Sequence, residues 1–101
     1  MKNKLLSQLK RKLRITWEDE NSDLEDLIKE AESYLLNLTN ATFDFDKEDW
    51  VRGLLLERCR YDYHNSLDEF EKNFSSEIKR LIALAALGRV GTKVEKDEKL
   101  P

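Results

Sequence analysis

The stretch DKEDWVRGLLLERCRYDYHNSLDEFEKNF, residues 46–74, decides the fold, because its apolar side chains do not stay on one face of a helix. At 3.6 residues per turn, one broad apolar arc contains Trp50, Val51, Leu54, Leu55 and Tyr61. The arc continues around most of the circumference through Leu56, Cys59, Tyr63, Leu67 and Phe70. Such a helix is either the central post of a bundle or is covered in part by another copy of the chain. We expect one copy to have more apolar surface than it can bury alone.

Helical spacing is also present on both sides of this stretch. Residues 3–13 set a stripe of leucines against a lysine-rich face, residues 22–38 form a one-faced amphipathic helix, and a last helix covers residues 75–87. Ser22 with Glu25 predicts a capping box at the start of the second helix. Asp46 is expected to cap the long helix. Between the first two helices, the Trp17 ring is expected to plug the base of the bundle.

Several positions predict where helices end. Asn40 is a plausible helix stop, and Gly88 suits a left-handed cap after the last helix. Asn65 marks a break in the long helix, after which Ser66 is expected to restart it with a second capping box. Phe43 and Phe45 predict a short extended turn that packs both rings inward. The sequence therefore predicts an all-α fold, a small bundle of about four helices with a long central helix. It divides the chain into a helical domain, residues 1–88, and a flexible tail, residues 89–101.

Composition favours a helical, intracellular protein. Charged residues make up 39% of the chain and apolar residues 40%, with 3 Gly and 1 Pro, which is few turn residues for a strand-rich fold. A single cysteine excludes an internal disulfide and fits a reducing compartment. The longest apolar run, Leu81–Leu87, is far shorter than the roughly 20 residues that span a bilayer. The N-terminus lacks the apolar core of a secretion signal.

Charge is segregated along the chain. A basic arm at the N-terminus contains no acid and consists of Lys2, Lys4, Lys10, Arg11, Lys12 and Arg14. Residues 15–50 are strongly acidic. The arm is either a solvated helix face, a contact for an acidic protein surface, or a nucleic-acid contact. It has no aromatic residue for base stacking, which weakens the last interpretation.

The search for catalytic or metal-binding motifs finds none. His64 is the only histidine and is expected on the surface, while Cys59 is expected to be a small core residue. The acids around Asp46 alternate as in a calcium loop but lack its glycine and its final glutamate. We therefore expect no enzyme activity, no cofactor and no metal.

One charged pair lies within the apolar arc. Arg58 and Asp62 are four residues apart, so their side chains can meet on one helix face. If the arc is buried, they must pair with each other or with another chain, because an unpaired buried charge is costly. The alternative is a solvated pair at a fraying helix end. The residues predicted to form an oligomer interface are Trp50, Arg58, Tyr61, Asp62 and Tyr63.

Three stretches resemble the head–tail connector (adaptor) family of tailed bacteriophages. They are LRITWEDE from Leu13, DLIKEAESYLLNLT from Asp26 and LLLERCRYDYHNSLDEFEKNF from Leu54. The resemblance covers roughly residues 5–87, and the last stretch is its most specific part. No catalytic motif defines this family, so no active-site residue is carried over.

The resemblance implies a helical subunit that assembles with itself into a ring, expected to be a dodecamer. Its partners would be the portal protein, a stopper or tail-completion protein, and genomic DNA that passes through without sequence-specific binding. It implies no membrane partner. The protein would be made in the host bacterial cytoplasm and located at the capsid–tail joint of the virion, and residues 92–101 would order on docking to the portal. The alternative is a small helical DNA-binding or regulatory protein that uses the basic arm.

Overall fold

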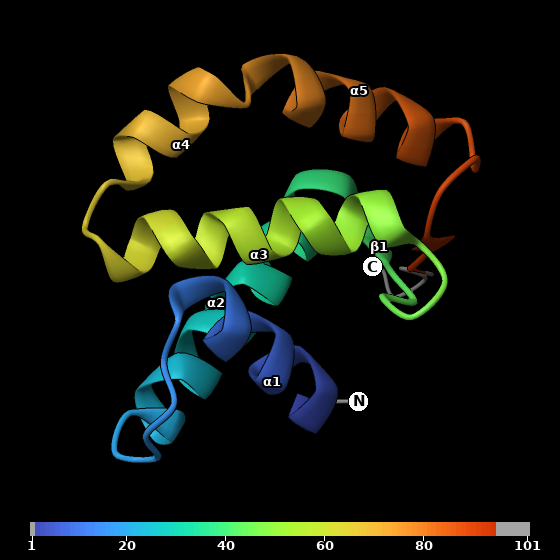
Figure 1. Cartoon of the computed structure of the whole chain (residues 1–101). Helices are drawn as coiled ribbons and strands as arrows, with labels where there is room; N and C mark the ends of the chain where they lie inside the picture. Colours follow the sequence, from blue (N-terminus) through green and yellow to red (C-terminus); the bar gives the residue numbers. More distant parts are fainter. Residues whose placement is uncertain (1, 95–101) are drawn as a thin grey trace, which may run out of the picture.

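Helix α3 lies at the centre of the molecule and contacts α1, α2 and α4. The computed structural model describes residues 2–94. Over this range the elements are α1 (Lys2–Leu13), α2 (Asn21–Thr39), β1 (Ala41–Thr42), α3 (Asp49–Tyr63), α4 (Leu67–Asn73), α5 (Ser75–Ala86) and β2 (Thr92–Lys93). Figure 1 shows α4 and α5 above α3, with α1 and much of α2 below it. The predicted all-α bundle with a central helix is confirmed.

The described chain has five helices instead of about four, because the long segment is interrupted after Tyr63. Asn65 adopts a left-handed conformation at φ 59°, which ends the helix where the sequence predicted a break. Ser66 precedes α4 but makes no side-chain capping bond; its hydroxyl instead donates to the carbonyl of His64 at 3.2 Å. The break is therefore where it was predicted, without the predicted capping box.

Helix ends were predicted better than helix starts. Asn40 at φ 57° ends α2 and donates its N–H to the Leu36 carbonyl at 2.6 Å, and Gly88 is left-handed at φ 73°. The capping box at the start of α2 is wrong, because α2 begins at Asn21 and no side chain caps it. α3 begins at Asp49 instead of after Asp46, because the acids before it bond within the loop.

In this loop the backbone N–H of Asp46 donates to Asp44 Oδ1 at 3.0 Å. The N–H of Asp44 in turn donates to Glu48 Oε1 at 2.9 Å. The carboxylates thus satisfy loop donors and are not available to cap the helix. Behind them, Phe43 and Phe45 pack partly buried against the core, with ring centroids 6.2 Å apart, as predicted.

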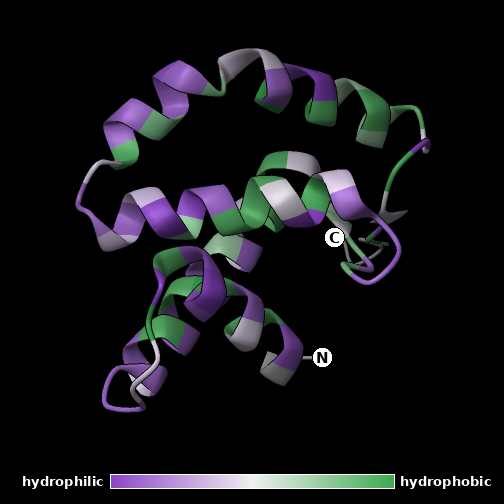
Figure 2. Ribbon diagram, viewed as in Figure 1, coloured by the Kyte–Doolittle hydropathy of each residue, from purple (hydrophilic) through white to green (hydrophobic). Residues whose placement is uncertain are grey.

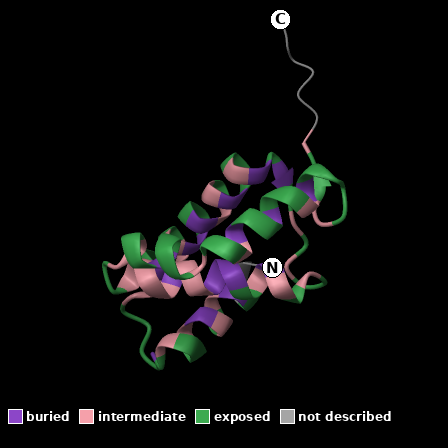
Figure 3. Ribbon diagram, turned by 90° about the horizontal axis from the view of Figure 1, so that it is seen from above, coloured by how far each residue is buried: buried purple, intermediate pink, exposed green. Residues whose placement is uncertain are grey.

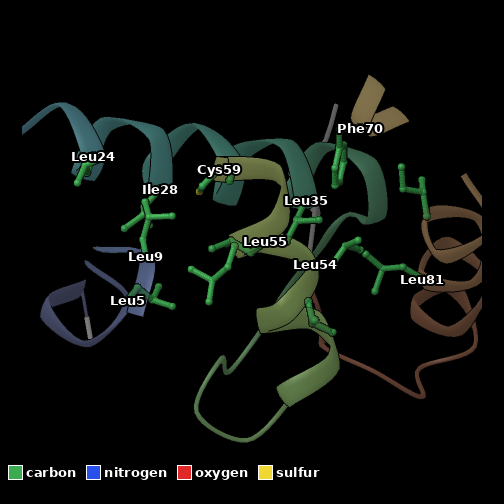
Figure 4. Packing of buried hydrophobic residues seen from close by; sticks show 14 of the residues in the cluster. Leu5, Leu9, Leu24, Ile28, Leu35, Leu54, Leu55, Cys59, Phe70 and Leu81 are labelled. Carbon is green, nitrogen blue, oxygen red and sulfur yellow. The ribbon is translucent and has the colours of Figure 1, made fainter. Parts of the chain in front are cut away.

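The core draws side chains from every helix of the described chain (Figure 4). Its largest fully buried side chains are Phe70, Leu9, Leu24, Leu35, Leu55, Leu81, Val51 and Cys59. Figure 3 shows buried and exposed residues alternating along the outer helices, as expected of amphipathic helices. Burial of this apolar surface is the main source of the stability of the fold.

One subunit buries the aliphatic residues and the cysteine of α3 without help, which favours the central-post alternative. Val51, Leu54, Leu55, Leu56 and Cys59 are all buried within the single chain. The expectation that this helix has more apolar surface than one copy can cover is therefore wrong for its aliphatic residues, whereas Trp50, Tyr61 and Tyr63 stay partly exposed. The two outer layers, α1 with α2 and α4 with α5, together enclose it (Figure 1).

Trp17 does not plug the base of the bundle. Its side chain is 46% exposed, and its Nε1 donates to Glu20 Oε2 at 2.7 Å. Ile15 takes the core position in this connector, with 6% exposure. An indole needs a partner for its N–H when buried, and here that partner lies at the surface.

The segment after Gly88 continues the fold. Strand β2 pairs antiparallel with β1, with Ala41 opposite Lys93, and the Val94 N–H donates to the Asn40 carbonyl at 3.0 Å. Residues 92–94 of the predicted tail, residues 89–101, are thus paired with β1 and Asn40, while the division of the chain at residue 88 stays a prediction. The rest of that tail, residues 95–101, lies outside the described residues.

Gly91 makes this return of the chain possible. It adopts φ 69°, and a Cβ at this position would lie 2.7 Å from the Phe43 ring. Its N–H donates to Glu48 Oε2 at 2.7 Å, so the loop acid before α3 also holds the C-terminal segment. Only glycine combines this backbone conformation with this close approach.

Candidate interaction surfaces

The three aromatic residues predicted at the interface are engaged within the chain. Trp50 is partly buried, with the guanidinium of Arg80 5.1 Å from the centroid of its ring. Tyr61 packs edge-on against Phe70 at 5.8 Å, and Tyr63 donates its hydroxyl to Glu20 Oε1 at 2.9 Å. That hydrogen bond raises the pKa of Tyr63. Intrachain packing therefore accounts for most of the apolar part of the predicted interface.

Arg58 does not pair with Asp62 in the described chain, so of the alternatives left open by their spacing, the ion pair within one subunit is not formed. Its guanidinium carbon lies 4.3 Å from the centroid of the Tyr34 ring on α2. The side chain follows this ring face because a cation gains attraction there, whereas a solvated i, i+4 pair contributes little. Two of its nitrogens, Nε and Nη1, are buried and have no hydrogen-bond partner in the described chain.

Tyr34 connects this arginine to the outer layer. Its hydroxyl donates to Glu71 Oε2 on α4 at 3.0 Å. Burial, together with this hydrogen bond to Glu71, raises the pKa of Tyr34 to about 12. The neutral ring thus bridges a cation on α3 and an anion on α4. Sequence spacing did not reveal this cluster, because its members come from three helices.

The two residues with the greatest catalytic potential lie where they were predicted. Cys59 is fully buried, and its thiol faces the Leu27 carbonyl at 3.6 Å. Burial raises the pKa of this thiol to about 12, which leaves it protonated and unreactive. His64 is exposed at the end of α3. Within residues 2–94, no group of three His, Cys, Asp or Glu side chains is placed to hold a metal, and none of the helices is long and apolar enough to cross a membrane.

The basic arm is a docked helix. Leu5 and Leu9 of α1 are buried in the core, which fixes the lysines against the rest of the chain. Its ion pairs are Lys4 with Asp46 at 3.2 Å, Lys10 with Glu18 at 3.4 Å and Lys12 with Glu57 at 2.8 Å. Arg11 and Arg14 are exposed, and the side chain of Lys2 lies outside the described part. Half of the arm's charge is therefore neutralised by the chain itself.

The ion pairs of Glu57 change the pKa of this carboxyl group. Partial burial opposes its ionisation, but hydrogen bonds from Lys12 and Arg60 together lower the pKa of Glu57 below its ordinary value of 4.5. Arg60 contributes a bond of 2.7 Å to Glu57 Oε1. The carboxylate thus links α3 to α1 through Lys12, while Arg60 binds it within α3.

Two adjoining grooves flank the loop after β1. One, of about 420 Å³, lies between this loop and α1, and the other, of about 400 Å³, lies between the loop and α2. Both are lined by Glu32, Thr42, Phe43 and Phe45. Sequence reasoning did not predict them, because they combine residues of α1, α2 and the C-terminal segment.

Comparison with known proteins identifies the family. A family model described as phage gp6-like head-tail connector protein matches residues 3–89. No curated protein and no solved structure gives a significant match. The matched range runs from α1 through α5 and includes the central helix, whose sequence carried the resemblance. The chain therefore belongs to the phage gp6-like head-tail connector family.

Proposed function

We propose that the chain is the ring-forming subunit of a phage head–tail connector, which docks beneath the portal and extends the DNA channel toward the tail. The observation that carries the proposal is the family match over residues 3–89, which gives the chain a structural role at the head–tail junction. The ring is proposed to be a dodecamer of this chain. Its further partners are the portal and a stopper or tail-completion protein, and DNA passes through the ring without sequence-specific binding.

Several features of the structure are consistent with a purely structural part. Cys59 is protonated and buried, and His64 stands alone at the surface. A subunit that covers its own central helix can fold before it assembles, so the proposed ring would form from folded subunits. We propose that the protein is made in the host bacterial cytoplasm and incorporated into the virion.

The polar residues of α3 stay proposed interface residues. Arg58 has two buried nitrogens without partners, and Asp62 makes no ion pair in the described chain. The third guanidinium nitrogen, Nη2, is not among these buried atoms, so an acceptor from a neighbouring subunit would bind the arginine there. Trp50, Tyr61 and Tyr63 would then border this contact with their exposed edges.

Sedimentation of the purified chain, alone and with the portal protein, tests the proposal. We expect a ring to form alone or on the portal, and the absence of association under both conditions would refute it. Titration with duplex DNA at two salt concentrations separates the DNA-binding alternative, which predicts tight binding with a steep salt dependence. The ion pairs of Lys4, Lys10 and Lys12 lead us to expect weak binding.

A further inference from the structure

Helix α5 presents a face that is both apolar and basic. Ile78, Leu81 and Ala85 point into the core, while Ile82 is 38% exposed and Leu87, just after the helix, is 71% exposed. Figure 2 shows hydrophobic and hydrophilic residues side by side along this helix. We call this surface the α5 face; it consists of Lys79, Ile82, Ala83, Ala86, Leu87 and Arg89, all exposed.

The α5 face contains no acid, and its cations lack partners. Lys79 and Arg89 form no ion pair within the described part of the chain. Arg80, beside the face, lies over the Trp50 ring and adds a third positive charge. An apolar strip bordered by unpaired cations is typical of a contact surface for an acidic partner.

A surface of opposite sign lies at the start of α2. We call it the acidic face; it consists of Trp17, Asp19, Asp23, Asp26 and Glu30, all exposed. These four acids make no ion pair and no side-chain hydrogen bond within residues 2–94. The half-exposed indole of Trp17 supplies the apolar part of this surface.

The two faces lie far apart on one subunit. In Figure 1, α5 lies above α3, whereas the start of α2 lies below it, beside α1. Figure 4 agrees, with Leu24 of α2 close to α1 and Leu81 of α5 on the other side of α3. Because the two faces are remote from each other, they cannot neutralise one another within one copy.

We propose that the α5 face of one subunit docks on the acidic face of α2 in the next copy of this chain. This inference rests on the proposed ring, which it deepens by naming the two surfaces that meet. Two different surfaces on opposite sides of a subunit produce a head-to-tail contact, which closes into a ring when the rotation permits. A two-fold contact through α5 alone would instead oppose basic residues to basic residues, which is unfavourable.

Charge reversal on each face, followed by an exchange of charge, tests the inference. One variant carries Lys79→Glu and Arg89→Glu, and a second carries Asp26→Lys and Glu30→Lys. A third variant combines all four changes and keeps the wild-type net charge, because two bases become acids and two acids become bases. Lys47→Glu, at an exposed lysine outside both faces, is the control.

Self-association is measured by sedimentation at about 0.05 M salt, where screening is weak, with the portal protein added if the wild type needs it. Each two-site variant is expected to associate at least about tenfold more weakly, and the combined variant to recover most of the wild-type association. The control should assemble like the wild type. Circular dichroism checks folding, and the neutral changes Lys79→Gln with Arg89→Gln and Asp26→Asn with Glu30→Gln replace any reversal that unfolds.

The outcomes separate this inference from the proposed function. If the wild type assembles and the two reversals leave assembly unchanged, the faces do not meet and only this inference fails. If both reversals weaken assembly but the combined variant does not recover it, the two faces do not contact each other and the inference also fails. If the Lys79 and Arg89 reversal instead abolishes binding to duplex DNA, the α5 face is a nucleic-acid contact. If the wild type assembles under neither condition, the ring itself is refuted.

Discussion

Replacing Arg58 by methionine is expected to increase the stability of the subunit. In the structure, the Nε and Nη1 atoms of this arginine are buried without hydrogen-bond partners, and each such group costs about 1–3 kcal/mol. The guanidinium recovers part of this cost from the Tyr34 ring 4.3 Å away, a contact of about 0.5–2 kcal/mol. Methionine keeps a long apolar stem over the ring and removes the unpaired donors.

We expect Arg58→Met to raise the free energy of unfolding by about 1–2 kcal/mol. This value lies in the lower part of the range for unpaired buried groups, because Arg58 is not fully buried. Thermal unfolding followed by circular dichroism should show a rise of about 4–8 °C per kcal/mol. The matched control is Arg60→Met, because Arg60 is hydrogen-bonded to Glu57 at 2.7 Å and lies over Tyr61. Its melting temperature should fall. A fall for both variants would show that Arg58 has favourable partners and refute the reasoning.

The same variant separates folding from assembly. If Arg58 forms a hydrogen bond to an acceptor of a neighbouring subunit on assembly, Arg58→Met will give a more stable subunit that assembles less well. Sedimentation with the portal protein measures the second quantity. Wild-type assembly of a stabilised variant would place Arg58 outside the interface.

Three further changes probe the fold. Trp50→Ala should lower the free energy of unfolding in urea by about 2 kcal/mol, because Trp50 is only partly buried. Phe70→Ala, at a fully buried ring, should lower it by about 3–5 kcal/mol, and equal losses for the two variants would contradict this. Glu57 has a lowered pKa in the fold, so its contribution is complete above about pH 4.5 and is lost as the pH falls through the lower folded value. The stability difference between wild type and Glu57→Gln should therefore shrink on acidification, and a constant difference would exclude the ion pairs. Gly91→Ala should cost about 1 kcal/mol or more, because its Cβ would clash with Phe43 at a positive φ; amide hydrogen exchange of β2 should accelerate, and unchanged exchange would argue against the strand pairing.

The sequence predicted those features that depend on local spacing. The apolar arc of residues 46–74 correctly indicated a central helix, and Asn40 and Gly88 marked helix ends because both adopt left-handed backbone conformations there. The predicted helix starts failed for local reasons: the acids before α3 bond to backbone N–H groups of their own loop, and the Ser66 hydroxyl bonds to the His64 carbonyl instead of capping α4. These are competing local hydrogen bonds, and the residue pattern alone does not rank them.

Long-range contacts account for what the sequence did not predict. Strands β1 and β2 are separated by about half of the sequence, so no local sequence pattern predicts their pairing. Arg58 turns to Tyr34, which lies on a different helix, instead of to the acid four residues away. The predicted interface residues on α3 are partly buried, and packing within one chain already explains the aromatic ones; their role as an interface stays a prediction.

The way α3 is covered constrains how the proposed ring would be held together. A subunit that buries its central helix alone does not rely on a large apolar interface, and the exposed large hydrophobic residues of the described chain are few and scattered: Trp17, Leu36, Ile82 and Leu87. In the proposed ring, contacts between copies would therefore combine small apolar patches with charge, which gives orientation and fast association more than high affinity. In a closed ring each weak contact is repeated around the circle, so the assembly is far more stable than one contact. Assembly that is weak per contact and dependent on charge should be sensitive to salt, and a ring that persists unchanged in high salt would exclude the charged faces as its main contacts.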